Sequence, residues 1–130
     1  MKLRIYFYTV LILPMILAGC EKIEIGESFD TTVGVKFRVD SNLSFLIDSI
    51  RDYRCPKDLI CIWGGDVDIH IRFNKTFNHV DTVIYLNNPD RNPIKIGGYS
   101  FKVNEVNPVR ESNKITPQKD FKINITVLKD

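Results

Sequence analysis

The chain has 130 residues, 44% of them hydrophobic, and a formal net charge of +2. This length suits a single domain with one core and excludes a two-domain architecture. The only charged residues among the first nineteen are Lys2 and Arg4, so the rest of the chain is close to neutral. The sequence has no cluster of Lys and Arg with interleaved aromatic residues, and we therefore expect no nucleic-acid partner.

Residues 1–19 predict a signal peptide. Two basic residues precede an uncharged apolar run that ends at Leu17-Ala18-Gly19-Cys20. A basic start, a short apolar centre and small residues before the cut are the features that export and cleavage require. A membrane-spanning helix is the alternative interpretation, but the run is shorter than the roughly 20 apolar residues that such a helix needs.

The sequence Leu17-Ala18-Gly19-Cys20 resembles the lipobox of bacterial lipoproteins. The resemblance implies cleavage before Cys20, lipidation of that cysteine and membrane lipid as a partner; the alternative is an ordinary secretory signal with a chance cysteine. Several acyl chains make such an anchor durable, since each buried CH2 contributes about 0.8 kcal/mol. We expect a protein of the cell envelope, anchored at the outer membrane and facing either the periplasm or the cell surface.

Residues 20–31 mix charges with Gly26 and Ser28 and predict a lipidated tether with a short strand at residues 23–25, followed by a folded domain at residues 32–130. Apolar and polar residues alternate through most of that domain, which is typical of half-buried strands. The predicted strands are residues 32–40, 43–51, 66–73, 80–86, 94–96, 99–106 and 121–128.

Two glycines at residues 97–98 predict a tight hairpin turn, because glycine tolerates the positive φ that such turns demand. A turn at this place pairs Ile96 with Tyr99 and Ile94 with Phe101. No segment shows a helical apolar period over three turns. We expect an all-β fold, a single antiparallel β-sandwich or a small barrel of about six to eight strands.

Cys55 and Cys61 are the two cysteines left once Cys20 is assigned to lipid. An even pair in an exported chain predicts one disulfide, since the compartment is oxidising. The two residues lie six positions apart, a separation that is readily closed to the roughly 5.5 to 6 Å that a disulfide requires between Cα atoms.

The most distinctive segment is Asp52-Tyr53-Arg54-Cys55-Pro56, followed after four residues by Cys61-Ile62-Trp63-Gly64-Gly65. It resembles a family of small exported lipoproteins common in Bacteroidota, whose signature runs Asp-Ser-Arg-Cys-Pro, three or four residues, and Cys-Ile-Trp-Ala-Gly. Tyr53 and Gly64 depart from that signature. The resemblance implies the fold and the location of the family, and it assigns no activity and no catalytic residue.

Arg54 and Trp63 are candidate binding residues within this segment. Arg54 beside Asp52 predicts an ion pair that shapes the loop, with recognition of an anion as the alternative. Trp63 lies next to the cysteine pair and is expected to pack on the disulfide and close one end of the core. The alternative is an exposed Trp63 that acts as a ligand platform.

Asp68 and His70 alternate outward on the strand predicted at residues 66–73 and are the other candidate binding residues. The spacing of the cysteines and histidines matches no zinc pattern, and the acidic residues have no EF-hand spacing. We therefore expect no metal and no cofactor. No catalytic triad order and no phosphate-binding loop is present in the sequence, so no catalytic residue is assigned.

These features together predict a lipid-anchored β-domain of the cell envelope that serves as a binding or structural accessory module. Its expected partner, besides membrane lipid, is an unidentified protein or glycan. The alternative is an envelope enzyme or inhibitor whose active loop spans residues 52–66.

Overall fold

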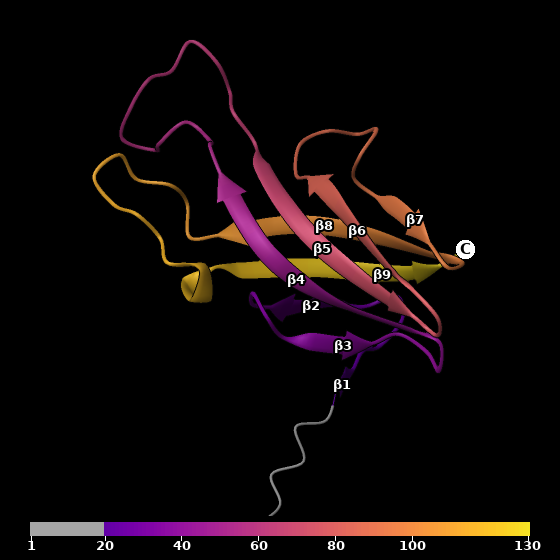
Figure 1. Ribbon diagram of the computed structural model, residues 1–130. Helices are drawn as coiled ribbons and strands as arrows, with labels where there is room; N and C mark the ends of the chain where they lie inside the picture. Colours follow the sequence, from indigo (N-terminus) through magenta and orange to yellow (C-terminus); the bar gives the residue numbers. More distant parts are fainter. Residues whose placement is uncertain (1–19) are drawn as a thin grey trace, which may run out of the picture.

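The computed structural model describes residues 20–130, which form two packed β-sheets (Figure 1). The predicted signal peptide, residues 1–19, lies outside the described residues. The first sheet has the strand order β1-β3-β4-β5-β6, with the bounds Glu21–Lys22, Lys36–Arg38, Leu43–Asp52, Val67–Lys75 and His79–Tyr85. The second has the order β2-β9-β8-β7, with the bounds Ser28–Thr31, Lys122–Lys129, Tyr99–Asn107 and Ile94–Ile96. A short 3-10 helix, η1 (Gln118–Asp120), precedes β9.

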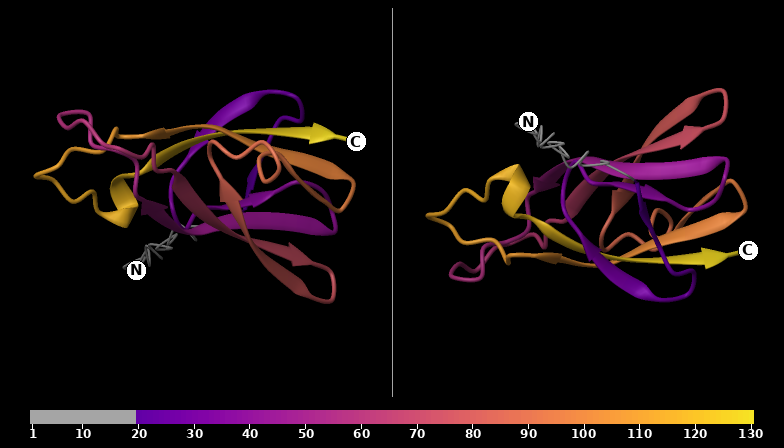
Figure 2. Two further views of the ribbon diagram at one scale, coloured as in Figure 1. Left: turned by 90° about the horizontal axis from the view of Figure 1, so that it is seen from above. Right: turned by 90° about the horizontal axis from the view of Figure 1, so that it is seen from below.

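The two sheets lie face to face, so the predicted β-sandwich is confirmed and the small barrel is not formed (Figure 2). Every neighbouring pair of strands is antiparallel except β1 and β3, which run parallel. The part of the chain that the structure describes contains nine strands, more than the six to eight predicted. The excess arises because β1 and β2 lie in the segment predicted to be a tether.

The core consists of side chains that alternate inward from both sheets. Phenylalanines of β3, β4, β5 and β8 form a continuous chain through it, in which the rings of Phe73 and Phe101 meet edge to face with their centroids 4.7 Å apart. Such aromatic pairs add about 0.5 to 1.5 kcal/mol beyond the burial of their area. The largest fully buried side chains of the core are Phe45, Phe73, Phe101, Ile47, Ile69, Ile71, Ile84, Ile123, Ile125, Val67, Val103 and Val106.

The prediction that residues 20–31 form a tether is wrong for all but the first of them. β1 pairs with β3, and β2 pairs with β9. Residues 23–25 are not a strand, but Ile23 is buried in the core, and the ring of Phe29 packs 5.1 Å from that of Phe37. The folded domain therefore begins at the residue that follows Cys20.

The predicted strand at residues 32–40 is wrong in its first half, because only Lys36–Arg38 is strand. Residues 32–35 form a turn at Gly34, whose φ is +87°, and this turn carries the chain from the second sheet to the first. Val33 packs against the core from the turn, whereas Val35 is exposed. The apolar alternation that suggested a strand here belongs to a crossover between the layers.

Two β-bulges explain where the two-residue period fails. The register of β4 shifts between Ile47 and Ser49, so that Ile47 and Ile50 both face the core. A similar shift in β8 brings Val103 and Val106 to the same inner face. A bulge inserts one extra residue and thereby returns the following side chains to the buried side.

The predicted glycine hairpin is confirmed. Ile96 pairs with Tyr99 and Ile94 with Phe101, and the two glycines at residues 97–98 have φ values of +60° and +84°. The polar composition of residues 107–119 predicts a loop, and residues 108–117 are indeed free of strand and helix, whereas Asn107 ends β8 and Gln118 begins η1.

Candidate functional site

Two long loops meet at one end of the sandwich. Residues 53–66 connect β4 to β5, and residues 108–121 connect β8 to β9 through η1. Both views of Figure 2 show these loops together at the end opposite to the C-terminus. This end contains the distinctive cysteine and tryptophan segment, and we describe it as the candidate functional site.

The predicted disulfide between Cys55 and Cys61 is confirmed, with the two Cα atoms 5.8 Å apart. Between the disulfide and the sheet, the segment that follows β4 and the segment that precedes β5 continue the hydrogen-bond ladder of these two strands as the two arms of the loop. The Tyr53 N–H donates to the Asp66 carbonyl at 3.0 Å. Gly65 lies between the arms with a φ of +63°, and a Cβ there would collide with the carbonyl oxygen of Tyr53. Glycine is thus required where the two arms approach each other.

Arg54 and Asp52 form the predicted ion pair. The guanidinium donates to the carboxylate through Nε at 2.9 Å and through Nη2 at 2.6 Å. It also donates to the carbonyl oxygens of Val106 at 2.9 Å and Pro108 at 3.0 Å, which places it across the end of β8. The two side chains are only 16% and 9% exposed. The donors of Arg54 are therefore directed at protein acceptors, and the residue shapes the loop rather than presenting itself to an anion.

Further polar contacts fasten the disulfide loop onto residues 108–117. Arg110 donates to the carbonyl oxygen of Arg54 at 2.8 Å, and Lys57 Nζ lies 2.6 Å from the Glu111 carboxylate. Asp58 accepts hydrogen bonds from the N–H and the hydroxyl of Ser112. We call these loop-to-loop contacts the latch.

The latch shifts the pKa values of its own members. Hydrogen bonds from Ser112 lower the pKa of the Asp58 carboxyl. The hydrogen bond and charge of Lys57 lower the pKa of Glu111, and Glu111 in turn raises the pKa of Lys57. All three groups are held in their charged forms near neutral pH.

Large apolar side chains project from the tip of the disulfide loop. Ile60 and Ile62 are almost fully exposed, Leu59 is 53% exposed and Trp63 is 68% exposed. We call these four residues the apolar tip. The prediction that Trp63 packs on the disulfide and closes the core is wrong. Pro56 is the buried member of the loop, and the short closed loop directs the indole into solvent.

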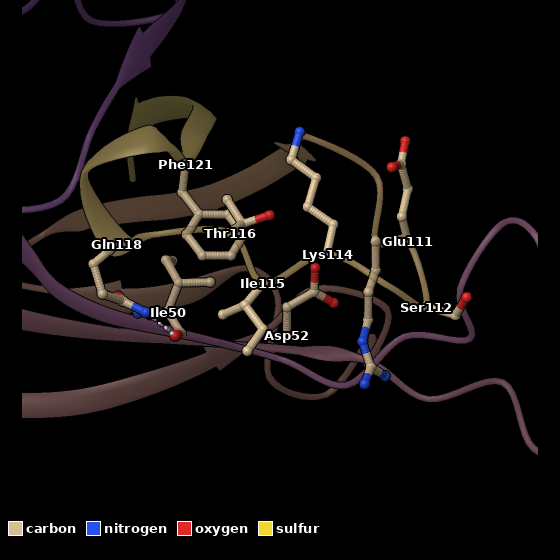
Figure 3. Close-up of a pocket in the computed structure, with 10 residues that line it drawn as sticks. Ile50, Asp52, Glu111, Ser112, Lys114, Ile115, Thr116, Gln118 and Phe121 are labelled. Carbon is tan, nitrogen blue, oxygen red and sulfur yellow. Dashed lines mark hydrogen bonds between the residues drawn. The ribbon is translucent and has the colours of Figure 1, made fainter.

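A cavity of about 270 Å³ lies between the end of β4 and the loop that leads into β9 (Figure 3). Figure 3 shows the Gln118 amide turned onto the backbone of Ile50, whose N–H and carbonyl it binds at 2.7 and 2.8 Å. Asp52, which also faces the cavity, is already paired with Arg54. The other lining residues are Arg110, Glu111, Ser112, Lys114, Ile115, Thr116 and Phe121.

The carboxylates of the predicted active loop all have protein donors. Asp52 is held by Arg54, and Asp58 by Ser112. Asp66 accepts the N–H of Val67 at 2.7 Å and that of Asn87 at 3.0 Å. A general base must be placed to accept a proton from a substrate, whereas each of these carboxylates already accepts hydrogen bonds from the protein. The arrangement therefore suits a rigid scaffold.

Asp68 and His70 lie on the outer face of the first sheet, away from the apolar tip. Asp68 is paired in register with Arg51 on β4 and Tyr85 on β6. It is only 8% exposed, which differs from the solvated position expected, and its Oδ1 has no hydrogen-bond partner among residues 20–130. Burial, and then the nearby Asp68, raise the pKa of Tyr53.

His70 contributes to a separate shallow depression of about 250 Å³ with Asp48, Arg72 and Asp81. Arg72 and Asp81 form an exposed ion pair across β5 and β6, with Nε 2.8 Å from Oδ1. The four predicted binding residues are therefore not brought together. Arg54 is inside the loop, Trp63 is on its tip, and the remaining two lie on the sheet.

Comparison of the chain with protein-family models, curated proteins and solved structures gave no match. Within residues 20–130, no group of three or more His, Cys, Asp and Glu side chains is placed to hold a metal ion. In the same part of the chain no helix has the length and the apolar character needed to cross a membrane.

Proposed function

We propose that this chain is a lipid-anchored module of the bacterial envelope that binds a partner protein through its apolar tip. The lipobox-like sequence that ends at Cys20 supports the anchor. The tip supports the binding role. A membrane lipid at Cys20 and a protein at the other end of the domain are the two partners.

The single observation that carries the binding role is the exposure of Ile60, Ile62 and Trp63 on a loop that is held rigid. The disulfide closes this loop, and the latch fixes it to the neighbouring loop. Exposed apolar clusters of this kind mark interaction sites, and a preordered loop loses little conformational entropy on binding.

The charges around the tip favour a protein over an anionic bilayer. Lys57 and Arg110 lie beside Asp58 and Glu111, so that the rim carries both signs. A mixed polar rim around an apolar centre is typical of protein interfaces. A glycan that stacks on Trp63 is the second candidate ligand, supported by the exposure of the indole.

The enzyme alternative receives less support from the geometry. The carboxylates of residues 52–66 are each engaged by protein donors, as described above. An inhibitor is a special case of the binding module, since a rigid exposed loop is also what an inhibitor presents to its target.

The test is site-specific photo-crosslinking in envelopes that contain the full chain. A photoreactive residue at Ile60 or Trp63 is compared with one at Phe77, which is at least as exposed as Trp63 but lies on the β5–β6 hairpin at the other end of the domain. We expect one discrete protein adduct from the tip and none from Phe77. The adduct should disappear in the Ile62→Ser variant, and the purified partner should bind the chain directly.

The proposal is contradicted if the same adducts form from Phe77, or if no discrete adduct forms from either tip position. The anchor has a separate test. Mass spectrometry of the mature protein should show a diacylglycerol on Cys20, and Cys20→Ala should abolish acyl labelling.

A further inference from the structure

A shallow cavity of about 230 Å³ lies beside Cys20 on the first sheet. Lys36 and Arg38 of β3 and Lys75 at the end of β5 line it. Lys22 adds a fourth cation: on β1 it lies directly opposite Arg38 of β3, so the two side chains are on the same face of the sheet. We call these four basic residues the cationic surface.

The basic residues of the cationic surface have no ion-pair partners within the described domain, although Lys22 also borders a neighbouring depression lined by Glu21, Glu24, Glu27 and Asp30. Across residues 20–130 none of its four members forms an ion pair. Asp40 is the one acidic residue that lines the cavity, and its carboxylate already accepts the N–H groups of Asn42 and Leu43 at 2.7 and 2.8 Å. The cavity is therefore a site of net positive charge.

Neutral hydrogen-bonding groups line the same cavity. They are the hydroxyls and amides of Ser41, Asn42, Ser44, Asn74 and Thr76. Cations together with short polar donors form the type of surface that binds a phosphate group.

We infer that the cationic surface binds the phosphate groups of an anionic phospholipid bilayer and holds the outer face of β1 and β3 against it. This inference deepens the proposed function and rests on its lipid anchor. β1 begins at the residue after Cys20, so an acylated cysteine brings the cavity directly to the headgroups. Each Lys or Arg held near an anionic membrane strengthens binding roughly fivefold.

The same placement orients the rest of the domain. Figure 1 shows β1 at the bottom of the molecule and the loop that follows β4 at the top. With β1 on the bilayer, the apolar tip projects away from the membrane, where a partner protein can reach it. The anchor and the binding loop are thus at opposite sides of one rigid sandwich.

The first experiment places the acylated mature protein in vesicles of phosphatidylcholine with 30% phosphatidylglycerol, or of phosphatidylcholine alone. Lysine acetylation followed by mass spectrometry then measures the access to each side chain. We expect Lys36 and Lys75 to be protected severalfold in the anionic vesicles only. Lys102 and Lys122, at exposed positions of the two central strands of the second sheet, should react equally in both.

The second experiment removes the anchor, so that binding depends on the protein surface alone. The parent protein is the segment 20–130 with Cys20→Ser, which retains both β-sheets. It is sedimented with the same two kinds of vesicle. Lys36→Ser with Arg38→Ser should weaken binding to the anionic vesicles about 25-fold, from two cations at roughly fivefold each. The matched control, Lys102→Ser with Lys122→Ser, should bind like the parent chain. Circular dichroism checks that both variants fold.

Equal loss in the two double variants would mean that only diffuse charge attraction acts, and it would overturn the inference. Equal binding to both kinds of vesicle would do the same. Protection of Lys36 by inorganic phosphate alone, at matched ionic strength, would reassign the site to a free anion and also overturn it. If Cys20 carries no lipid, the proposed anchor fails, whereas the sedimentation result still decides whether the cationic surface binds the bilayer.

Discussion

The guanidinium of Arg54 binds the carboxylate of Asp52, two positions earlier in the chain, through two parallel hydrogen bonds. The remaining contacts of the same guanidinium reach the carbonyl oxygens at the end of β8. One side chain thus joins the start of the disulfide loop to the strand of the other sheet. The first prediction follows from this arrangement.

Replacing Arg54 with Leu should lower the free energy of unfolding by about 3 to 5 kcal/mol, because the mostly buried Asp52 then loses its partner. Guanidinium chloride unfolding measures the loss. Arg72→Leu is the matched control, since it breaks the exposed pair with Asp81 and should cost less than about 1 kcal/mol. Similar losses in the two variants would show that Arg54 has no special structural role.

The second prediction concerns the disulfide. Changing both Cys55 and Cys61 to Ser should destabilise the domain by about 2 to 2.5 kcal/mol, as the chain-entropy model gives for a loop of about seven residues. The β fold should persist, because the latch contacts of Lys57 and Asp58 are independent of the bridge. Thermal unfolding followed by circular dichroism measures both effects. Loss of the β signal at room temperature would contradict this expectation.

The third prediction uses two adjacent glycines. Gly65→Ala should destabilise the domain by about 1 to 3 kcal/mol, because Gly65 has a positive φ and a Cβ there meets the Tyr53 backbone. Gly64→Ala should have little effect, since nothing lies within 4 Å of the added Cβ and φ is not positive. Urea unfolding of the two variants side by side gives the comparison. Equal tolerance would refute the close approach of the two loop arms.

The fourth prediction is a pH dependence of the latch. Asp58 and Glu111 have folded-state pKa values below their ordinary ones, so their contribution is complete above the unfolded carboxyl values near 4. It is lost as the pH falls through the lower folded values. The raised pKa of Lys57 keeps its contribution intact up to its ordinary value near 10.4 and removes it above the folded one.

Hydrogen exchange of the Ser112 amide, which donates to Asp58, should therefore accelerate below about pH 4 once the intrinsic rate is corrected. The Val103 amide is the control, because it donates to the uncharged Asn92 side chain at 3.0 Å and should show no such change. A flat corrected rate at Ser112 down to pH 2 would argue against the charged latch.

The fifth prediction addresses Trp63, the single tryptophan of the chain. Its fluorescence should show the red-shifted emission and the ready acrylamide quenching of an indole in water, given its 68% exposure. Trp63→Ser should change the free energy of unfolding by no more than about 0.5 kcal/mol. Phe101→Ala, at a fully buried position, should cost about 3 to 5 kcal/mol. A quench-resistant indole would mean that the ring packs on the disulfide after all.

Much of the fold could be predicted from the sequence because long strands repeat their pattern several times. β5 presents Val67, Ile69, Ile71 and Phe73 inward without interruption, and the glycine hairpin fixes its own register. β2 was missed because it has four residues and only Thr31 among them is buried. A segment so short is defined by its partner on the distant β9, which a local pattern does not reveal.

The candidate site was predicted only in part. The cysteine pairing and the Asp52–Arg54 pair involve neighbours in sequence, so the residue types were sufficient. The exposure of Trp63 depends on a loop too short to fold back, and the coverage of Asp68 depends on its neighbours on the two adjacent strands, β4 and β6. The latch to residues 110–112 joins positions more than fifty apart and left no signal in the sequence.

The pairing of β2 with β9 also bears on how an exported chain reaches its destination. Asp30 and Asn124, joined by a 2.7 Å hydrogen bond between these strands, lie 94 positions apart. Until residues near 124 have been synthesised, β2 has no partner and the second sheet cannot close. A nascent chain with such distant pairing folds slowly and stays extended for longer. If the chain is exported as proposed, this slow folding keeps the polypeptide unfolded while it passes through the translocation channel. The sandwich then closes after the chain has crossed the membrane.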